Sequence, residues 1–319
     1  IIQEIVNLKN CKFSSHEFAT RLKLAPAGKD LISKNNLPKI YFSKNNEVLK
    51  FNFEEEMKYF LKNNANEEKI NLGSTLIKNN FNKYFNINEE NILYSKFPDL
   101  KLVNKEKIFI LLSNVLWESR FCLKEHHTIF NNFKEFLIET MNFFKDSSAK
   151  LIIKGHPMEK AKNDYDDSLE SVYQIHKNKN VHLINSNEIS SYSLSNITNN
   201  IIIYDTDMGA EMVFKNKRVI TCGRAQYKDF NISFFPKNKL EYFKTLQDLC
   251  SNEIVNSKLF RVNQRNAALF WYFFNFNIFK DFGFTYGDST NQILKNFEFI
   301  FSEESYSNKD YENPITDIL

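Results

Sequence analysis

Residues 201–222 read IIIYDTDMGAEMVFKNKRVITC, and this stretch decides the fold class. Residues 201–204 form an apolar run of strand length, and the apolar residues of 208–214 recur at helical spacing. A second apolar run occupies 219–222 after a short basic turn. A strand, a helix and a strand joined this closely indicate a right-handed βαβ unit, and therefore a parallel sheet.

The upstream residues continue this alternation of strands and helices. Ile108–Leu112 is a continuous apolar run, as expected of a strand that is buried on both faces. We also expect strands at 151–153 and 181–184, helices at 129–144 and 169–175, and a short helix that begins at Ser190 or Ser191. The residues from 105 onward therefore predict an α/β, Rossmann-like domain.

The N-terminal hundred residues give a weaker pattern. A strand at 39–42 and helical spacing at 53–61 and 76–85 are the clearest features. A complete Rossmann-like domain commonly takes about 150 residues, so this segment is too short for one. The chain also begins with Ile1 rather than Met. We therefore expect the first strands of an N-terminal domain to be missing.

Composition excludes several classes of protein. The 319 residues hold 42 Lys and Arg against 39 Asp and Glu, a net charge of +3 that does not indicate a nucleic-acid binder. No apolar run reaches the roughly 18 residues that a transmembrane helix needs. The four cysteines form no C-x-x-C pair, which disfavours a zinc site and a disulfide scaffold. A cytoplasmic protein is the expectation.

Polar residues follow each predicted strand. Parallel α/β sheets bind ligands at the carboxyl ends of their strands, so these residues are expected to lie on one rim. In chain order they are Ser113, Asn114 and Glu118; His156 and Pro157; Ser190 and Ser191; Asp205, Thr206 and Asp207; and Gly223 and Arg224. Their convergence predicts a ligand site.

His156 is the clearest candidate for chemistry on this rim. Gly155 permits a tight turn before it, and Pro157 ends the strand because proline has no N–H to donate. A histidine there could donate a hydrogen bond to a phosphate or act as a general acid. A single histidine is often only structural, and that alternative stays open.

Asp205 and Asp207 allow two further interpretations. Two carboxylates one residue apart could share a divalent cation, or they could cap the helix that follows. Free N–H groups at Thr206–Gly209 instead favour a nucleotide phosphate, so we predict that no metal binds here. A metal site formed by Asp205 and Asp207 stays open as the alternative. Glu211 could accept hydrogen bonds from ribose hydroxyls or stabilise the helix dipole.

Five segments, taken in order, resemble the motifs of a known family. They are Ser113–Glu118, Leu151–Glu159, Ile189–Leu194, Tyr204–Glu211 and Val219–Tyr227. They are similar to motifs of the capsule polysaccharide biosynthesis family of bacterial glycosyltransferase-like proteins, which includes the β-Kdo transferases. The resemblance covers about residues 105–280.

The resemblance implies a GT-B-like fold, in which two Rossmann-like domains with parallel sheets face each other across a cleft. The N-terminal one is expected to be incomplete here. The implied division is an acceptor-side domain at 1–104, a nucleotide-sugar-binding domain at 105–260, and a segment at 261–319 that holds a tail and a helix packing back on the first domain.

The implied activity is transfer of a sugar from a nucleotide-activated donor, which is CMP-Kdo in characterised relatives, to a glycan or lipid-linked acceptor. No metal or other cofactor is implied. The apolar stretch 267–274 follows Arg261 and Arg265 and could contact the inner membrane peripherally. Its apolar residues lie on all sides, which favours a buried helix.

The resemblance also assigns roles to residues. His156 would contact the donor phosphate, and Glu211 would face the ribose. The rest of the expected nucleotide site is Ser113, Asn114, Lys154, Pro157, Ser190, Ser191, Thr206, Gly209 and Arg224. Glu118 stands where the family has Asp and is the candidate nucleophile or base, with His156 as the second catalytic residue. The longer side chain matters because displacements of about 1 Å affect such chemistry.

Two other functions fit the same residues. A sugar-nucleotide epimerase of the same fold would also present a His and a Glu on the rim. A non-catalytic binding subunit of capsule assembly would tolerate both the Glu at 118 and the acidic pair at 205 and 207.

Overall fold

The protein is described by a computed structural model that divides into two compact units, residues 81–270 (the sheet unit) and residues 1–80 with 271–319 (the terminal unit). The structure describes these residues: 15–18, 39–43, 58–114, 129–157, 168–223, 225–251, 260, 263–276 and 280–281. Two predicted site residues, Glu118 and Arg224, lie outside the described residues.

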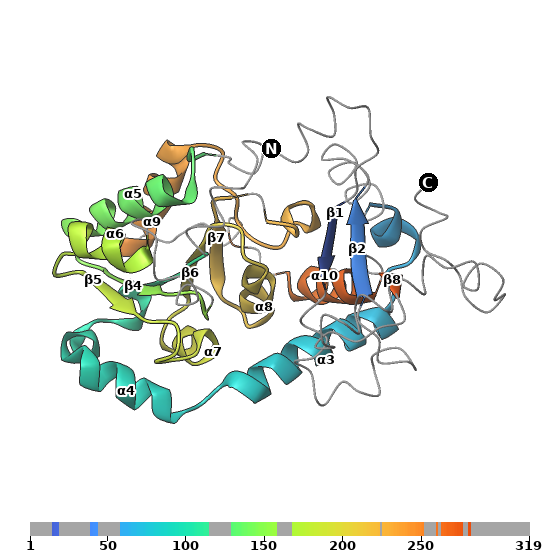
Figure 1. Cartoon of the computed structure of the whole chain (residues 1–319), viewed down its shortest axis with the longest axis horizontal. Coiled ribbons are helices and arrows are strands. Elements are labelled where there is room, and N and C mark those ends of the chain that lie inside the picture. The colour runs from blue at the N-terminus through green and yellow to red at the C-terminus, as the bar shows by residue number, and fades with distance from the viewer. Residues whose placement is uncertain are drawn as a thin grey trace, which may run out of the picture. The chain divides into compact units, whose positions relative to one another are not determined.

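A five-stranded parallel sheet forms the centre of the sheet unit, in the order β5-β4-β3-β6-β7 (Figure 1). The strands are β3 (Ile108–Leu112), β4 (Lys150–Lys154), β5 (Val181–Ile184), β6 (Asn200–Ile203) and β7 (Arg218–Thr221). All five were predicted from their apolar runs. The α/β class and the parallel, Rossmann-like sheet are therefore confirmed for this unit.

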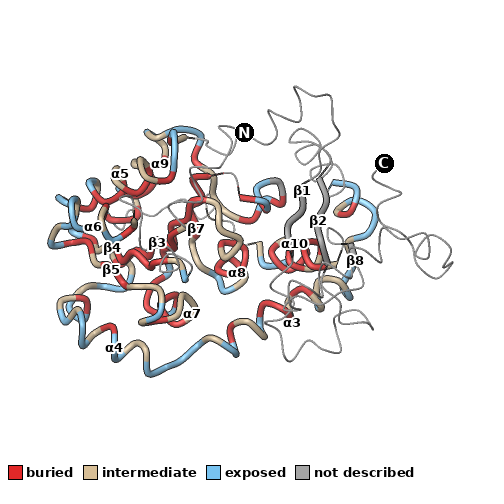
Figure 2. The backbone as a smooth tube through the Cα atoms, in the orientation of Figure 1, coloured by how far each residue is buried: buried red, intermediate tan, exposed pale blue. Residues whose placement is uncertain are grey.

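The central strand β3 is buried along its whole length and pairs with a neighbour on each edge. Ile110 of β3 lies opposite Ile152 of β4 and Ile201 of β6. Every residue of β3 is buried, and the sheet is drawn largely as buried in Figure 2. An unbroken apolar run is the sequence that such a strand requires, since neither face meets water.

Helices cover both faces of this sheet. In Figure 1, α5 (Phe133–Lys145), α6 (Leu169–His176) and α9 (Lys239–Ser251) lie on one side, and α7 (Ser191–Leu194) and α8 (Met208–Phe214) lie on the other. The helix predicted from residue 129 begins at 133, because the Asn132 side chain accepts a 2.8 Å hydrogen bond from Glu135 N–H and caps it. The sequence pattern had not identified α9.

Aromatic side chains fill the core beneath α5 and α9. The ring of Phe136 lies 5.3 Å from that of Phe130, 5.3 Å from that of Tyr204 and 6.0 Å from that of Tyr242. These rings belong to one buried cluster that spans the sheet and three helices. The abundance of phenylalanine, 32 residues in the chain, thus supplies much of this core.

The described strands of the terminal unit differ from expectation. β1 (Ser15–Phe18), β2 (Lys39–Ser43) and β8 (Lys280–Asp281) form an antiparallel sheet in that order. The sequence predicted a parallel sheet in the N-terminal domain, so the parallel arrangement is confirmed in the sheet unit alone. Antiparallel neighbours need no helical crossover between them, which short strands such as these permit.

Residues 58–63 are helical, in partial agreement with the helix predicted at 53–61, of which residues 53–57 lie outside the described ones. Three longer helices follow in the chain. They are α3 (Glu67–Tyr84), α4 (Asn88–Lys96) and α10 (Gln264–Phe276). Residues 267–271 of α10 are buried, as its apolar surface predicted, and Phe273 packs its ring 5.1 Å from that of Phe60. None of the helices in the described ranges combines the length and apolar character that a membrane crossing requires.

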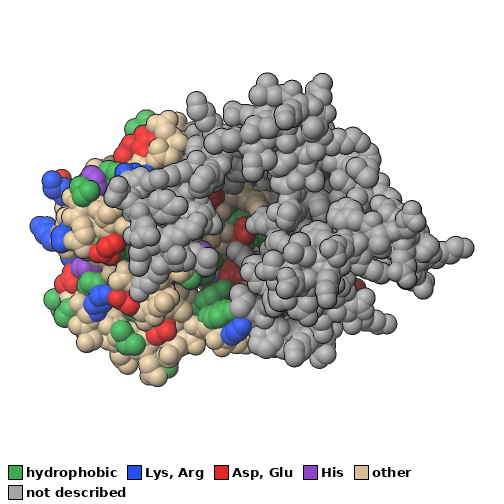
Figure 3. Space-filling model, viewed as in Figure 1, with side chains coloured by type: hydrophobic (Ala, Val, Ile, Leu, Met, Phe, Trp, Pro, Cys, Tyr) green, Lys and Arg blue, Asp and Glu red, His purple; other side chains and the backbone are tan. Residues whose placement is uncertain are grey.

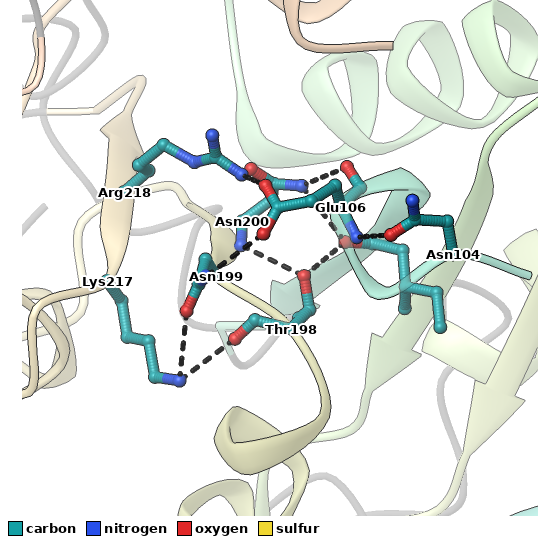
Figure 4. A network of polar contacts seen from close by, with 8 residues as sticks. Asn104, Glu106, Thr198, Asn199, Asn200, Lys217 and Arg218 are labelled. Carbon is teal, nitrogen blue, oxygen red and sulfur yellow. Dashed lines mark hydrogen bonds and ion pairs between the residues drawn. The ribbon is translucent and has the colours of Figure 1, made fainter. Parts of the chain in front are cut away.

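A polar network ties together the amino ends of β3, β6 and β7 (Figure 4). Arg218 at the start of β7 pairs with Glu106, which precedes β3. Asn200 at the start of β6 donates to the carbonyls of Glu106 (2.8 Å) and Ile108 (3.3 Å), and Lys217 donates to the Thr198 carbonyl (3.0 Å). These bonds join the three strands at this edge, although Asn200 Oδ1 and Arg218 Nε are buried without a partner among the described residues.

Charged side chains of both signs are interspersed on the described part of the surface that Figure 3 shows, as the near-balanced composition leads one to expect. The two described cysteines, Cys222 and Cys250, are buried and form no disulfide.

The environment of His182 on β5 generates the first prediction. Its Nε2 lies 3.3 Å from the Asp99 carboxylate, which also pairs with Lys150 at 2.8 Å. Burial lowers the pKa of His182, the Asp99 carboxylate opposes this, Lys150 adds to it, and the net pKa lies below its ordinary value. The folded protein thus binds the proton more weakly than the unfolded chain.

We expect the free energy of unfolding to fall as pH drops below about 6.5, where an unfolded histidine gains its proton, towards the lowered pKa of the folded state. His182→Gln keeps a polar side chain that does not titrate, so its melting temperature should depend less on pH over that window. Calorimetric melting of both proteins from pH 7.5 to 5 measures this. Equal slopes would contradict the assigned environment.

Candidate functional site

The direction of the crossovers locates the candidate site. From β3 the chain moves outward through β4 to β5, then returns to β6 on the other edge of β3 and moves outward to β7. Where successive crossovers leave in opposite directions, the loops separate and form a crevice at the carboxyl ends of the strands. In this sheet the switch point, and the crevice expected there, lie between the ends of β3 and β6. The residues there are Ser113 and Asn114 after β3, and Tyr204–Asp207 after β6.

A hydrogen bond joins the two sides of this crevice. The Asn114 side chain donates from Nδ2 to the Asp205 carboxylate, although the two residues are far apart in sequence. The Asn114 Oδ1 atom is buried and has no hydrogen-bond partner within the described ranges. A buried acceptor without a donor costs about 1–3 kcal/mol, so a donor group on a bound molecule would be stabilised there.

The start of α8 forms the β6 side of the crevice. Asp207 occupies the N-cap position, but its side chain makes no capping hydrogen bond. The alternative in which the acidic pair caps this helix is therefore wrong for Asp207, and Asp205 accepts from Asn114 instead. The N–H of Gly209 bonds to the Thr206 carbonyl at 3.2 Å. Among the described side chains, no cluster of three or more His, Cys, Asp or Glu could hold a metal ion.

The side chain of Tyr227 lies next to the start of α8. It is fully buried, and its hydroxyl bonds to Thr221 Oγ1 at 3.1 Å, which in turn bonds to Ser233 Oγ at 2.8 Å. Burial raises the pKa of Tyr227, the bond to Thr221 opposes this, and the Asp207 and Asp205 carboxylates raise it further. Tyr227 is therefore a neutral phenol near the acidic pair, a feature that residue patterns at the strand ends did not single out.

At the end of β4, Lys154 and His156 differ in their surroundings. The Lys154 ammonium is buried and donates to the carbonyls of Gly155 (3.3 Å), Asn185 (3.1 Å) and Ser186 (2.6 Å). It therefore holds the loop after β5. His156 is half-buried and Pro157 is exposed. Both lie on the predicted rim, since they follow β4 directly.

The two serines after β5 also differ. Ser190 is the N-cap of α7, and its Oγ accepts from Ser193 N–H at 3.0 Å and donates to the Tyr84 carbonyl at 2.8 Å. Its hydroxyl is thus engaged within the protein. Ser191 is half-buried and begins the helix. Glu211 on α8 is buried, with 1% of its surface exposed, so it does not lie on a solvated helix face.

A comparison with known families agrees with the residue patterns. Residues 46–263, more than half of the chain, match the family described as "Capsule polysaccharide biosynthesis protein". The match begins upstream of the rim segments and includes all five of them. Among the curated proteins, none matches the chain significantly.

Gly209 provides a test of this geometry. A Cβ added there would lie 2.0 Å from the Tyr227 hydroxyl and 2.3 Å from Ile203 Cδ1, whereas one at Gly155 would meet its nearest atoms at 3.4 Å. Overpacking a well-filled site costs about 1–3 kcal/mol. We expect Gly209→Ala to lower the free energy of unfolding by about that amount in urea titrations. Gly155→Ala is the matched control and should change it much less; equal losses would contradict the close packing of α8.

Proposed function

Because the chain belongs to the capsule polysaccharide biosynthesis family, which supports a role in capsule synthesis, we propose that it is a glycosyltransferase. The reaction proposed is transfer of a sugar from a nucleotide-activated donor to a glycan or lipid-linked acceptor. The observation that carries this proposal is the hydrogen-bonded pair Asn114 and Asp205 at the switch point of a Rossmann-like sheet. Nucleotides bind at such points in open α/β sheets.

The donor nucleotide is proposed to occupy the carboxyl edge of β3, β4 and β6. Several features support this location. The strand order puts the switch point at the carboxyl edge, and Asn114 has a buried acceptor oxygen there without a partner among the described residues. Thr206 and Ser191 would offer hydroxyls, and His156 a ring N–H, to the phosphate. Glu211 would accept from the ribose. CMP-linked donors are one candidate class.

The proposed chemistry breaks the bond between the anomeric carbon and the phosphate oxygen, and forms a bond from that carbon to an acceptor hydroxyl. The nucleotide leaves with the electron pair, and His156 would stabilise its phosphate through a charge-assisted hydrogen bond. Glu118 would receive the acceptor proton as base in a direct displacement. Alternatively, Glu118 would attack the anomeric carbon as nucleophile, and the acceptor oxygen would then displace the Glu118 carboxylate and pass its proton to it. No metal is needed for either step, and residues 1–104 are proposed to bind the acceptor.

The protein is proposed to work on the cytoplasmic side of the membrane, where activated sugars are made, with peripheral contact to the membrane when its acceptor is lipid-linked. Product analysis separates transfer from the two alternatives. Isomerised sugar nucleotide formed without acceptor would favour the epimerase, and nucleotide binding without any turnover would favour the binding subunit. Activity that is lost with EDTA and restored by Mn²⁺ or Mg²⁺ would return the Asp205–Asp207 pair to consideration.

Nucleotide binding is the primary test. Titration calorimetry with CMP, CDP, UDP, GDP and ADP should show binding by at least one of them. His156→Ala should weaken that binding about tenfold or more, because a charge-assisted hydrogen bond contributes about 1.5–3 kcal/mol. His176→Ala, at the far end of α6, is the matched control and should bind normally. No binding by any nucleotide would refute the proposal.

Glu118 is tested by separating binding from chemistry. Glu118→Gln should bind nucleotide as the wild type does, yet lose sugar transfer by about two to four orders of magnitude, as expected for loss of an acid–base group. Glu118→Asp restores a carboxylate of the length that the family uses, so it should retain much of the activity. Radiolabelled sugar incorporation measures both variants, and full activity of Glu118→Gln would exclude the catalytic role.

A further inference from the structure

The end of α3, the short loop after it and α4 pack against the short helix α7 within the sheet unit; residues 81–96 are together called the α3–α4 connection. The ring of Tyr84 stacks on that of Tyr192 at 5.4 Å with an interplanar angle of 17°, and Phe81 meets Tyr192 edge-on at 4.8 Å. Tyr192 belongs to α7, which follows β5 at the ligand edge of the sheet. The α3–α4 connection is thus attached directly to the rim.

Hydrogen bonds fix this attachment at its centre. The Glu89 carboxylate accepts from Ser190 N–H at 2.7 Å, and the Ser190 hydroxyl donates to the Tyr84 carbonyl at 2.8 Å. Asn86 N–H donates to Ser193 Oγ at 2.9 Å. The backbone N–H and the hydroxyl of Ser190 therefore both bond to residues of the α3–α4 connection.

The loop between β5 and α7 is held from both sides. On the α4 side, the Lys96 ammonium pairs with Glu188 at 2.5 Å, and Glu188 accepts from the Asn185 side chain at 3.2 Å. On the β4 side, Lys154 donates to the carbonyls of Asn185 and Ser186. A continuous set of polar contacts therefore runs from α4 through this loop to the strand that ends at His156.

A helix as short as α7, with four residues, has little stability of its own and takes its orientation from its contacts. The contact with Glu89 is the one in which a charged group meets a backbone N–H, and such hydrogen bonds are stronger than neutral ones. Glu89 itself sits in the first turn of α4, where the helix dipole favours a carboxylate. The acceptor is therefore preorganised.

We infer that Glu89 is a positioning residue for the nucleotide rim, which acts through Ser190 on α7 and couples nucleotide binding there to the α3–α4 connection. Ser190 is then part of the support, and its neighbour Ser191 is the serine that meets the nucleotide. Because α3 begins in the terminal unit and ends at Tyr84 in the sheet unit, a change at the rim reaches the helix that links the two units. The inference rests on the proposed function.

The first arm of the test needs no nucleotide. Hydrogen exchange of the full chain is compared for the wild type, Glu89→Ala and Glu89→Gln, with Glu90→Ala as the control. Glu90 is the neighbouring acidic residue of α4, and its carboxylate lies 3.9 Å from the Lys105 ammonium. Exchange of residues 189–194 should rise about tenfold in Glu89→Ala, less in Glu89→Gln, which keeps an acceptor oxygen, and not in Glu90→Ala.

The second arm adds the nucleotide of the calorimetry panel that binds most tightly. It should slow exchange at residues 84–96 in the wild type and in Glu90→Ala. In Glu89→Ala it should bind about tenfold more weakly and leave 84–96 unchanged, a difference that a purely structural role would not produce. If Glu89→Ala does not fold, Glu89→Gln should still show a partial loss of the protection at 84–96.

The outcomes separate the two ideas. If nucleotide binds but exchange at 84–96 does not respond, or responds equally in the Glu89 and Glu90 variants, the inference is overturned and the proposed function stands. If no nucleotide of the panel binds, the proposed function fails, and the coupling inferred from it fails as well.

Discussion

The pairing of β3 with both β4 and β6 is the constraint on which the rest of the sheet unit depends. Parallel strands need crossovers, and the crossovers leave β3 in opposite directions, so the loops after β3 and β6 separate at one place only along this sheet. The apolar run of β3 requires a place that is covered on both faces, as β4 and β6 also have. The strand order then puts the switch point, with Asn114 and Asp205, at the ends of β3 and β6.

Both edges of the sheet combine matched and unmatched polar groups. At the amino edge, Glu106, Asn200 and Arg218 bond to one another and to backbone carbonyls, yet Asn200 Oδ1 and Arg218 Nε are buried without a partner in the described part of the chain. At the carboxyl edge, Asn114 Oδ1 is in the same position. Unmatched buried groups are costly wherever they occur, so the strand order, which puts the switch point at the carboxyl edge, is what distinguishes that edge as the ligand side.

The sequence was sufficient for the elements whose burial is uniform. Ile108–Leu112, Val181–Ile184 and Met208–Phe214 begin and end where their apolar patterns do. It was insufficient where an element is defined by contacts that are distant in sequence. Helix α4, with a single buried residue, had no distinctive pattern, and the strand pairing of the terminal unit depends on β8, far from β1 and β2 in the chain. The buried Tyr242, Leu246, Leu249 and Cys250 of α9 do recur at helical spacing, so that helix was within reach of the sequence. Asn216, in the turn before β7, adopts a left-handed φ of 60°, which asparagine tolerates better than most residues.

Local sequence was also sufficient for only part of the candidate site. The residue types at the strand ends predicted which residues lie at the carboxyl edge, but not which of them are available to a ligand. Lys154, Ser190 and Asn114 were all expected to bind nucleotide, and all three lie at the carboxyl edge. Their hydrogen bonds separate them: the ammonium of Lys154 and the hydroxyl of Ser190 hold neighbouring backbone, whereas Asn114 bridges the crevice and keeps an acceptor. Such accounting requires knowing which distant carbonyl or carboxylate lies within 3 Å, and that information is absent from local patterns. A ligand site is therefore best read in two layers, with the groups already satisfied by the protein holding in place the fewer groups that meet the substrate.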